Sequence, residues 1–347
     1  VVIDRNAQAD GASIRNFGFV TVTGQPRGLV WRRAHRSREV WDEVAAEAGI
    51  SILQRGLWLP VRRPEAVAVL EEFMATEMGA GCRLLTPAEA LARAPEVTGP
   101  DTRAVLWSPH DLRVDSRSAI PQLAEWLSAR HGVTFVRSTT VLGVDPPRIE
   151  TAQGVIEAEM TVVCPGDDFC GLFPDVLADQ GLVRCKLQMM RLASPGFALP
   201  APVMSDLGLI RYGGYADLPA AAALRSRLAA EQGEELANGV HLIAVQDADG
   251  VMVVGDSHHE AATPDPFASE AVNRLIIDEW CAATGQPAPP VLERWIGTYA
   301  RGPKHSLIAA PHPRVRLALI TAGNGASTAF AFADEVIANL LEEKPAS

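Results

Sequence analysis

A glycine-rich turn near the end of the chain has the residue types of a cofactor site. Residues 315–321 are mostly apolar, which predicts a buried strand, and apolar residues recur at helical spacing over 330–340. The turn between them contains Gly323, Asn324, Gly325, Ala326 and Ser327. A strand that runs through glycines into a helix leaves the first backbone N–H groups of that helix free and directs the positive end of its dipole above the turn. The turn therefore suits an anionic or electron-rich cofactor, and the alternative is an ordinary strand-to-helix connection.

The first residues of the chain read as the end of a nucleotide-binding strand. Val1 to Asp4 is a short apolar stretch, expected to be buried, that ends in an acid. In a dinucleotide-binding βαβ unit, the acid that holds the ribose follows a Gly-x-Gly-x-x-Gly turn by about 20 residues. That spacing falls before residue 1, so we expect the first strand, glycine loop and first helix of a Rossmann unit to be missing upstream. The alternative for Asp4 is a surface strand that ends in Asp.

The composition bounds the class of protein. With 347 residues, of which 48% are hydrophobic and 21% charged, the chain is typical of a globular protein of about two domains. The net charge of −11 argues against a nucleic-acid-binding surface, since phosphate neutralisation needs clustered Lys and Arg. No apolar run is long enough to cross a bilayer, and no signal-peptide pattern is present. We expect a soluble, cytoplasmic protein with neither nucleic acid nor membrane as a partner.

The cysteines do not indicate a disulfide framework or a zinc site. They are odd in number, and none forms a C-x-x-C pair. We expect them to be reduced and packed. They are Cys82, Cys164, Cys170, Cys185 and Cys281.

Several helices must support the turn. A long helix is expected from Leu29, closed by Gly49, and a second one follows Pro64. Thr86 begins a capping box with proline at the first helical position, which predicts a third helix. Asp115 can cap a fourth.

Strands and loops account for most of the remaining chain. Residues 50–60 read as a strand pair, and residues 106–115 as a polar and aromatic loop. Further strands are expected at 133–136, 139–144, 160–164, 186–192, 207–212, 240–246 and 251–256. The last two are joined by an Asp-Ala-Asp-Gly turn, which predicts an antiparallel sheet. Nucleotide-type elements thus lie at both ends and in the middle, so the chain passes between two domains more than once.

Several strings, taken in order, resemble one superfamily of flavoenzymes, the FAD-dependent D-amino-acid oxidases, glycine oxidases and sarcosine oxidases. They are Val162-Val163-Cys164-Pro165-Gly166, Cys185-Lys186-Leu187-Gln188, Gly255-Asp256-Ser257-His258, Trp295-x-Gly297 and Gly323-Asn324-Gly325. Longer strings are similar to a clade of these enzymes linked to aminophosphonate catabolism. They are Arg15-Asn16-Phe17-Gly18, Leu106-Trp107-Ser108-Pro109-His110, Asp111-Leu112-Arg113-Val114-Asp115 and Arg184-Cys185-Lys186-Leu187-Gln188-Met189.

The resemblance implies an α/β fold of two domains. One is a Rossmann-like FAD-binding domain, whose first strand and glycine loop are missing from this chain, and the other is an antiparallel-sheet substrate domain. Residues 1–50, 117–183 and 296–347 would form the FAD-binding domain, and residues 51–116 and 184–295 the substrate domain.

The resemblance also implies an FAD cofactor and amine oxidation. Hydride would leave the carbon that bears the amine for the flavin, and the imine product would hydrolyse to an aldehyde or keto compound. Asp4 would accept from the adenosine ribose, Val141 would offer its backbone to the adenine, and Gly166 would let the backbone approach the cofactor. The glycine-rich turn would place backbone donors against the flavin carbonyl, where negative charge accumulates on reduction. The implied cofactor-binding residues are Asp4, Arg5, Ser13, Arg15, Asn16, Val141, Gly166, Gly323, Asn324, Gly325, Ala326 and Ser327.

Three departures from the family pattern bear on the cofactor. The missing glycine loop puts tight FAD binding by residues 1–347 alone in question. Phe19 stands where many members have His, and the turn reads Gly-Asn-Gly-Ala-Ser where Gly-x-Gly-Met-Thr is more usual. Neither substitution removes a backbone donor.

A phosphonate substrate would require charge-assisted hydrogen-bond donors. The Arg guanidinium suits it best, because it donates two parallel N–H bonds, whereas the Lys ammonium acts as a single compact charge. The candidates are Arg211, Tyr212, Tyr215, His241, His258, Tyr299, Arg301 and Lys304, each with a solvated surface position as its alternative. No side chain is assigned to catalysis, although Lys186 is considered near the flavin, with structural pairing as its alternative. His258 and His259 do not predict a metal site, since neighbours on a strand point to opposite faces and no third ligand accompanies them.

The sequence therefore predicts an FAD-dependent oxidoreductase that oxidises the C–N bond of a small amine, an aminophosphonate related to 2-aminoethylphosphonate. O2 or another acceptor would reoxidise the flavin. Two alternatives stay open. One is a glycine, sarcosine or D-amino-acid oxidase-like enzyme acting on an amino carboxylate, and the other is a cofactor-free, non-catalytic fragment.

Overall fold

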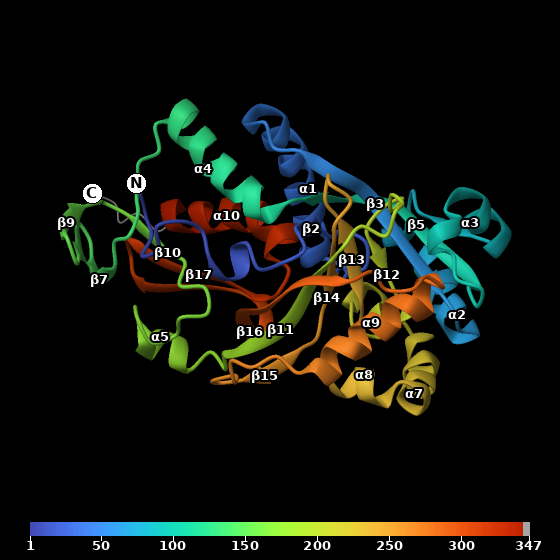
Figure 1. The fold of residues 1–347 in the computed structure, drawn as a ribbon. Coiled ribbons are helices and arrows are strands. Elements are labelled where there is room, and N and C mark those ends of the chain that lie inside the picture. Colours follow the sequence, from blue (N-terminus) through green and yellow to red (C-terminus); the bar gives the residue numbers. More distant parts are fainter. Residues whose placement is uncertain (343–347) are drawn as a thin grey trace.

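One long strand, β16 (Val291–His312), runs through both halves of the computed structural model, which describes residues 1–342 (Figure 1). Its first half pairs antiparallel with β11 (Val183–Leu192). Its second half pairs antiparallel with β17 (Val315–Ala322), the strand that enters the glycine-rich turn. One sheet therefore carries the antiparallel strands at one end and the turn at the other.

The other elements follow this sheet along the chain. The remaining strands are β1 (Val2–Ile3), β2 (Phe19–Val20), β3 (Ile52–Val61), β4 (Arg83–Leu85), β5 (Ala104–Val114), β6 (Phe135–Val136), β7 (Val141–Asp145), β8 (Arg148–Thr151), β9 (Gly154–Glu157), β10 (Thr161–Val163), β12 (Val203–Met204), β13 (Ile243–Gln246), β14 (Met252–Gly255) and β15 (His259–Ala261). The helices are α1 (Leu29–Ala48), α2 (Pro64–Met74), α3 (Pro87–Arg93), α4 (Ser116–His131), α5 (Pro174–Ala178), α6 (Gly213–Ala216), α7 (Ala221–Glu231), α8 (Gly233–Ala237), α9 (Glu270–Thr284) and α10 (Gly325–Glu342). Short 3₁₀ turns lie at Gly11–Ser13, Glu77–Gly79, Pro95–Val97 and Asp206–Ile210.

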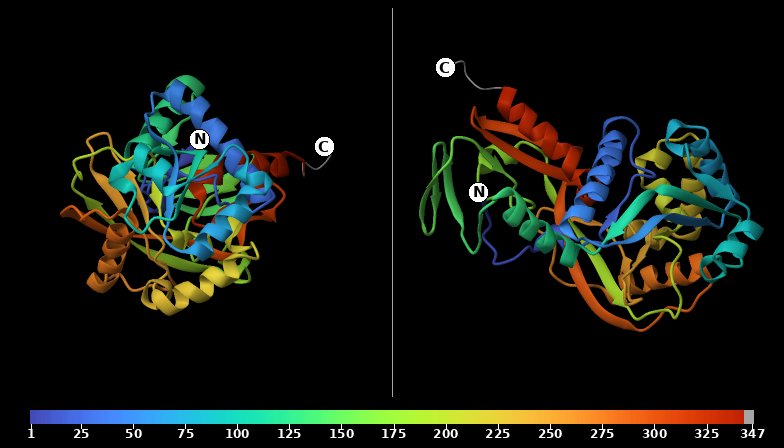
Figure 2. Two further views of the ribbon diagram at one scale, coloured as in Figure 1. Left: turned by 90° about the vertical axis from the view of Figure 1, so that its right-hand side faces the viewer. Right: turned by 90° about the horizontal axis from the view of Figure 1, so that it is seen from above.

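The nucleotide-type elements gather at one end of the molecule, with the red α10 and the green β7–β9 in Figure 2, away from the cyan α3 at the other end. There β1 pairs parallel with β6, and β10 pairs parallel with β17. Helix α10 packs on β17, and α1 packs on α10. Val2 in β1 is 44% exposed, so the expectation of a buried first strand is wrong; within residues 1–342, β6 is the only strand paired with β1.

The expected last part of the FAD-binding domain, 296–347, begins inside β16, and its residues 343–347 lie outside the described chain. The long strand thus belongs to both expected domains. The sheet continues from β17 through β16, β11, β14 and β13 to β12, β3 and β5. The predicted antiparallel pairing of the 240–246 and 251–256 segments is confirmed, as β13 with β14.

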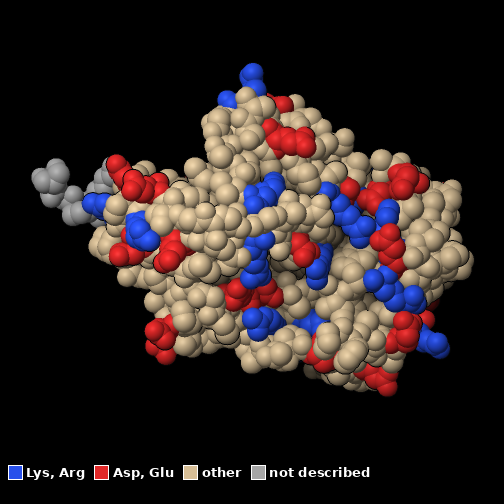
Figure 3. Space-filling view, turned by 60° about the vertical axis from the view of Figure 1, so that its left-hand side comes forward, with Lys and Arg blue, Asp and Glu red and all other residues tan. Residues whose placement is uncertain are grey.

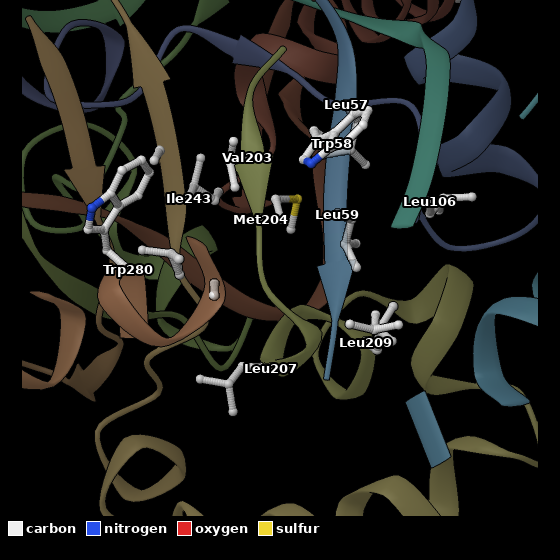
Figure 4. Packing of buried hydrophobic residues seen from close by; sticks show 14 of the residues in the cluster. Leu57, Trp58, Leu59, Leu106, Val203, Met204, Leu207, Leu209, Ile243 and Trp280 are labelled. Atoms are coloured by element: carbon white, nitrogen blue, oxygen red, sulfur yellow. The ribbon is translucent and has the colours of Figure 1, made fainter. Parts of the chain in front are cut away.

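The largest core lies between the antiparallel strands and the helices around them. Figure 4 shows Trp58 and Leu59 of β3 near Val203 and Met204 of β12, with Trp280 of α9 on the far side of β13. Both tryptophan side chains are at most 1% exposed. This packing fixes β13 and β14 in position beside β11.

The sequence signals for helix ends are confirmed. Gly49 closes α1 in the left-handed conformation, with a φ of 68°. The capping box at Thr86 is complete, since Thr86 and Glu89 satisfy each other's backbone amides. Asp115 caps α4 by accepting from the amide of Arg117.

The expected loop over 106–115 is wrong, because all of it except Asp115 belongs to β5 and pairs antiparallel with β3. The polar side chains of Ser108, Asp111 and Arg113 are buried and have partners inside the protein. The Asp111 carboxylate accepts from the amides of Val22 (2.7 Å) and Thr23 (2.9 Å) and from the Thr23 hydroxyl (2.6 Å). Polar residues that satisfy each other inside a sheet look like loop residues when only their types are considered.

Two further expectations about strands are wrong. The segment 50–60 contains one strand, β3, which begins at Ile52 and pairs with β5 and β12, so that no second strand lies within this segment. The expected strand at 207–212 is instead the 3₁₀ turn Asp206–Ile210, in which the amide of Gly208 donates to the carbonyl of Ser205. The buried carboxylate of Asp206 accepts from the Arg63 guanidinium (2.9 Å) and holds the turn.

The surface mixes both signs of charge. Figure 3 shows a face on which Lys and Arg side chains lie next to Asp and Glu. Many of these charges are paired, for example Arg15 with Asp10 at 2.7 Å. No helix within residues 1–342 has both the length and the apolar character that crossing a membrane requires.

The Asp111→Ala substitution is expected to lower the free energy of unfolding by about 3 kcal/mol, because it leaves the buried amides of Val22 and Thr23 without an acceptor. Asp111→Asn keeps a carbonyl oxygen for these amides and is expected to cost less than half as much. Urea unfolding of both variants checks this, and equal losses would contradict the role given to the hydrogen bonds.

Candidate active site

The turn after β17 closes against a tyrosine of β16. Gly323 has a φ of 69°, and a Cβ atom on it would lie 2.8 Å from Cζ of Tyr299. Glycine is therefore required where the Tyr299 ring lies against the turn. Burial raises the pKa of the Tyr299 hydroxyl, so the phenol is neutral.

The start of α10 offers unpaired polar groups and open space. The amides of Gly325 and Ala326 make no hydrogen bond to another residue within 1–342, as the first turn of a helix allows. Asn324 donates through Nδ2 to Gln25 (3.2 Å), whereas its buried Oδ1 has no partner in the described chain. A Cβ atom on Gly325 would meet nothing within 4 Å. These features fit a planar cofactor with carbonyl groups.

Other atoms of the turn are anchored in the protein. The Ser327 hydroxyl accepts from the amide of Thr21 at 2.8 Å. The carbonyl of Ala326 accepts from the indole of Trp41 at 2.9 Å. The start of α10 is thus held by contacts on the side of α1 and β2.

His241, Asp256 and His258 form a buried group next to β13 and β14, the His–Asp–His cluster. Nε2 of His241 lies 3.2 Å from Oδ1 of Asp256, and Nε2 of His258 lies 3.6 Å from Oδ2. The centroids of the two imidazole rings are 4.9 Å apart. Because Ile243 pairs with Gly255 in antiparallel register, His241 comes to lie beside the segment that follows β14.

The hydrogen bonds around the cluster fix the form of both histidines. Nδ1 of His241 and Nδ1 of His258 face the carbonyl of Gly239 at 3.5 Å and 2.9 Å. A carbonyl can only accept, so each Nδ1 carries the proton and each Nε2 presents its lone pair to Asp256. Burial, reinforced by the charge of Arg211, lowers the pKa of both imidazoles well below its usual value, and both rings are neutral. Burial raises the pKa of Asp256 to about 7, although Arg211 opposes this shift.

The cluster adjoins the turn through aromatic contacts. The ring centroid of His258 lies 6.4 Å from that of Tyr299, whose ring contacts Gly323. On the other side, the Tyr212 hydroxyl lies 3.4 Å from Nε2 of His241. A continuous series of buried polar side chains therefore runs from the start of α10 into the antiparallel sheet.

Arg211 supplies a positive charge beside the cluster. Its side chain is exposed, and its guanidinium forms no ion pair or hydrogen bond with any other residue within 1–342. Its charge nevertheless lowers the pKa of Asp256 and of the Tyr212 hydroxyl, against the effect of burial. The guanidinium is free to bind an anion at the edge of the cluster.

The other candidate side chains lie apart from this group. Arg301 is paired with Glu260 at 3.1 Å, and the Lys186 amino group with Asp265 at 2.8 Å. Lys304 is exposed. The structure thus brings together Arg211, Tyr212, His241, His258 and Tyr299.

Asp256 was not expected at this site from the sequence. The expectation that no third ligand accompanies His258 is wrong, since ligand atoms of His241, Asp256 and His258 lie within 4.8 Å of one another. The spacing of Asp256 and His258 gave a signal, because residues two apart on an extended chain face the same side. The contribution of His241 depended on the register between β13 and β14.

The residues expected at the adenosine end lie among the nucleotide-type elements. Asp4 follows β1, and Arg5 forms an ion pair with Asp168 at 2.9 Å. Gly166 has a φ of 64° and no atom within 4 Å of the position of a Cβ. Val141 begins β7.

Residues 13–16 lie in the chain between β1, at the expected adenosine end, and β2. Asn16 accepts from the amide of Gly18 at 2.6 Å, and the Arg15 guanidinium contacts Asp10 at 2.7 Å. Arg15 also lines an open groove of about 550 Å³, and the other residues along it are Ile14, Arg117, Pro266, Ala268, Arg294, Trp295 and Ile296.

Several known proteins share the fold of this chain. Residues 1–339 match the family described as FAD dependent oxidoreductase (DAO). Glycine oxidase from Geobacillus kaustophilus has a similar fold, with 17% identity, a TM-score of 0.75, and coverage of 99% of this chain and 88% of that one. L-proline dehydrogenase from P. horikoshii gives 18% identity and a TM-score of 0.73, covering 98% of this chain and 86% of its own.

Iminodiacetate oxidase from Chelativorans sp. is also similar in structure. It shares 17% identity, with a TM-score of 0.70 and coverage of 99% of this chain and 89% of that one. At these identities the likeness extends to the fold alone. No curated protein matches the chain.

The Gly323→Ala substitution is expected to lower the free energy of unfolding by about 2 kcal/mol, because a Cβ would collide with Tyr299 in a left-handed backbone conformation. Gly325→Ala is the matched control and is expected to cause no loss, since open space surrounds that position. Chemical denaturation measures both, and equal stability of the two variants would contradict the contact.

Proposed function

The chain belongs to the DAO family of FAD-dependent oxidoreductases, and on this premise we propose that it oxidises the C–N bond of a small amine that carries an anionic group. The substrate we propose is an aminophosphonate related to 2-aminoethylphosphonate. The observation that carries this proposal is the free guanidinium of Arg211 beside the buried polar group that adjoins the turn.

The residues of the turn fit the FAD cofactor of this family. The free amides of Gly325 and Ala326 would face the flavin carbonyl, and the open space at Gly325 leaves room for the ring. Asp4 and Gly166 would hold the adenosine half. FAD, when bound, accepts the hydride from the carbon next to the amine. The resulting imine would be hydrolysed by water.

Arg211 and its neighbours would bind the anionic group. A phosphonate has three acceptor oxygens and more than one negative charge near neutral pH, so it suits several donors together with a guanidinium. The hydroxyls of Tyr212 and Tyr299 are held neutral by burial and can donate. The longer strings that resemble the aminophosphonate-linked clade support the same substrate.

An amino carboxylate is the second candidate. The same Arg211 guanidinium supports it, because a planar guanidinium can donate two hydrogen bonds to a carboxylate. The fold shared with glycine oxidase and iminodiacetate oxidase supports it as well. A carboxylate has two oxygens and one charge, so it would use fewer of the donors around Arg211. The relative rates on matched substrates separate the two candidates.

The enzyme loaded with FAD is expected to have a higher kcat/KM for 2-aminoethylphosphonate than for β-alanine, its carboxylate analogue. Arg211→Met is expected to raise KM for the phosphonate by about 10- to 100-fold, the loss of one charge-assisted contact. Arg36→Met, which removes an exposed arginine of α1 that pairs with Glu39 at 3.2 Å, is the control and should leave KM unchanged.

Steady-state kinetics with both substrates measure these values. A preference for β-alanine would favour the amino carboxylate. A preparation that lacks the visible absorption bands of protein-bound flavin, even after addition of FAD, would favour the alternative that the chain is a cofactor-free, non-catalytic fragment.

A further inference from the structure

The His–Asp–His cluster has more buried hydrogen-bond acceptors than donors. Both Nδ1 protons are directed at the carbonyl of Gly239, so the two Nε2 lone pairs and the Asp256 carboxylate face one another. Oδ1 of Asp256 is buried and makes no hydrogen bond with any residue in the described chain, although Nε2 of His241 is only 3.2 Å away. Acceptors that face each other in a buried site require a cation between them.

The surrounding charge decides which cation fits. The positive charge of Arg211 acts on all three members of the cluster. A divalent metal ion would add two positive charges against the single negative charge of Asp256. One proton, in contrast, neutralises the carboxylate and leaves Arg211 as the only excess charge. Burial strongly disfavours uncompensated charge, so the cluster is suited to take up a proton.

An amine substrate must lose a proton before it can be oxidised. At neutral pH a small alkyl amine is an ammonium ion, and its nitrogen has no lone pair to form the C=N bond. The His–Asp–His cluster adjoins Tyr299 and therefore the turn that fits the cofactor. A proton acceptor is thus present on the substrate side of the proposed site.

We propose that the His–Asp–His cluster is the general base that takes the ammonium proton of the substrate and holds it at Oδ1 of Asp256, shared with Nε2 of His241. An N–H bond breaks and leaves its electron pair on nitrogen, while an O–H bond forms on the carboxylate. No oxidant takes part in this step. The inference rests on the proposed function, since only an amine supplies such a proton.

The groups around Asp256 are consistent with this role. A pKa of about 7 makes Asp256 a good acceptor near neutral pH, because a general base is most effective when its pKa is close to the working pH. Two histidines that stay neutral can share the proton without adding charge. The titratable and charged groups whose electrostatic effects reach this cluster are Arg211, Tyr212, Cys185, Tyr299 and Arg301.

The test is the pH dependence of kcat/KM for the amine in the FAD-loaded enzyme. In the unmodified enzyme, kcat/KM is expected to rise with pH up to about 7 and then level off. Asp256→Asn is expected to reduce kcat/KM at pH 7.5 by about 100-fold. In this variant kcat/KM should keep rising, about tenfold per pH unit, towards pH ~10, because only amine already deprotonated in water reacts.

His259→Gln is the matched control. Its ring faces Asn238 (3.0 Å) and lies outside the cluster, so the profile should not change. If Asp256→Asn does not fold or bind flavin, His241→Gln provides a second route. It removes the nitrogen that shares the proton, and the acidic limb of kcat/KM should move to lower pH.

Three results would overturn the inference. A profile of Asp256→Asn that levels off as in the unmodified enzyme would show that the carboxylate takes no proton from the substrate. One divalent ion per chain, removed by a chelator together with activity, would show a metal site instead. Flavin-bound enzyme that oxidises no amine at any pH would overturn the proposed function itself, which is a distinct outcome.

Discussion

The hydrogen-bond ladder of β16 is the constraint on which the proposed active site depends. This one strand pairs with β11 over its first half and with β17 over its second, so residues of the antiparallel sheet and of the glycine-rich turn belong to the same rigid element. Tyr299 lies between the two halves and contacts Gly323. Without the continuous strand, the His–Asp–His cluster and the free amides at the start of α10 would have no fixed position relative to each other.

The electrostatics of the site follow from burial together with a single external charge. His241, Asp256 and Tyr299 are shielded from water by the core between β11, β13 and the helices behind them, and each is therefore driven towards its neutral form. Arg211 stands at the edge, exposed and unpaired within the described chain; its charge opposes the effect of burial at Asp256 and Tyr299 and reinforces it at His241. Such a site favours a ligand whose anionic group lies at the exposed edge, next to Arg211, and whose reacting centre lies inside in an uncharged form.

The parts of the fold that depend on local chemistry could be predicted from the sequence. The end of α1 at Gly49, the capping box at Thr86 and the strand–turn–helix unit around Gly323 follow from single residues and short spacings. The strand β5 could not be predicted, because buried Asp111 finds its partners near residue 22, far away in sequence.

The same limit applies to the proposed site. Arg211, His241 and His258 were found as polar residues of the right types, but the pairing of His241 with Asp256 required the register between β13 and β14. Composition and spacing show which hydrogen-bond donors and acceptors a chain contains. They do not show which of these groups contact one another in the folded interior.

The length of β16 also governs how a ligand can reach the interior. Two halves joined by an unbroken ladder cannot swing apart as hinged lobes without separating β16 from β11 or β17, and this would break many backbone hydrogen bonds at once. A ligand must therefore reach the proposed site while the two halves keep their relative position, and the exposed Arg211 is the part of that site that it meets at the surface.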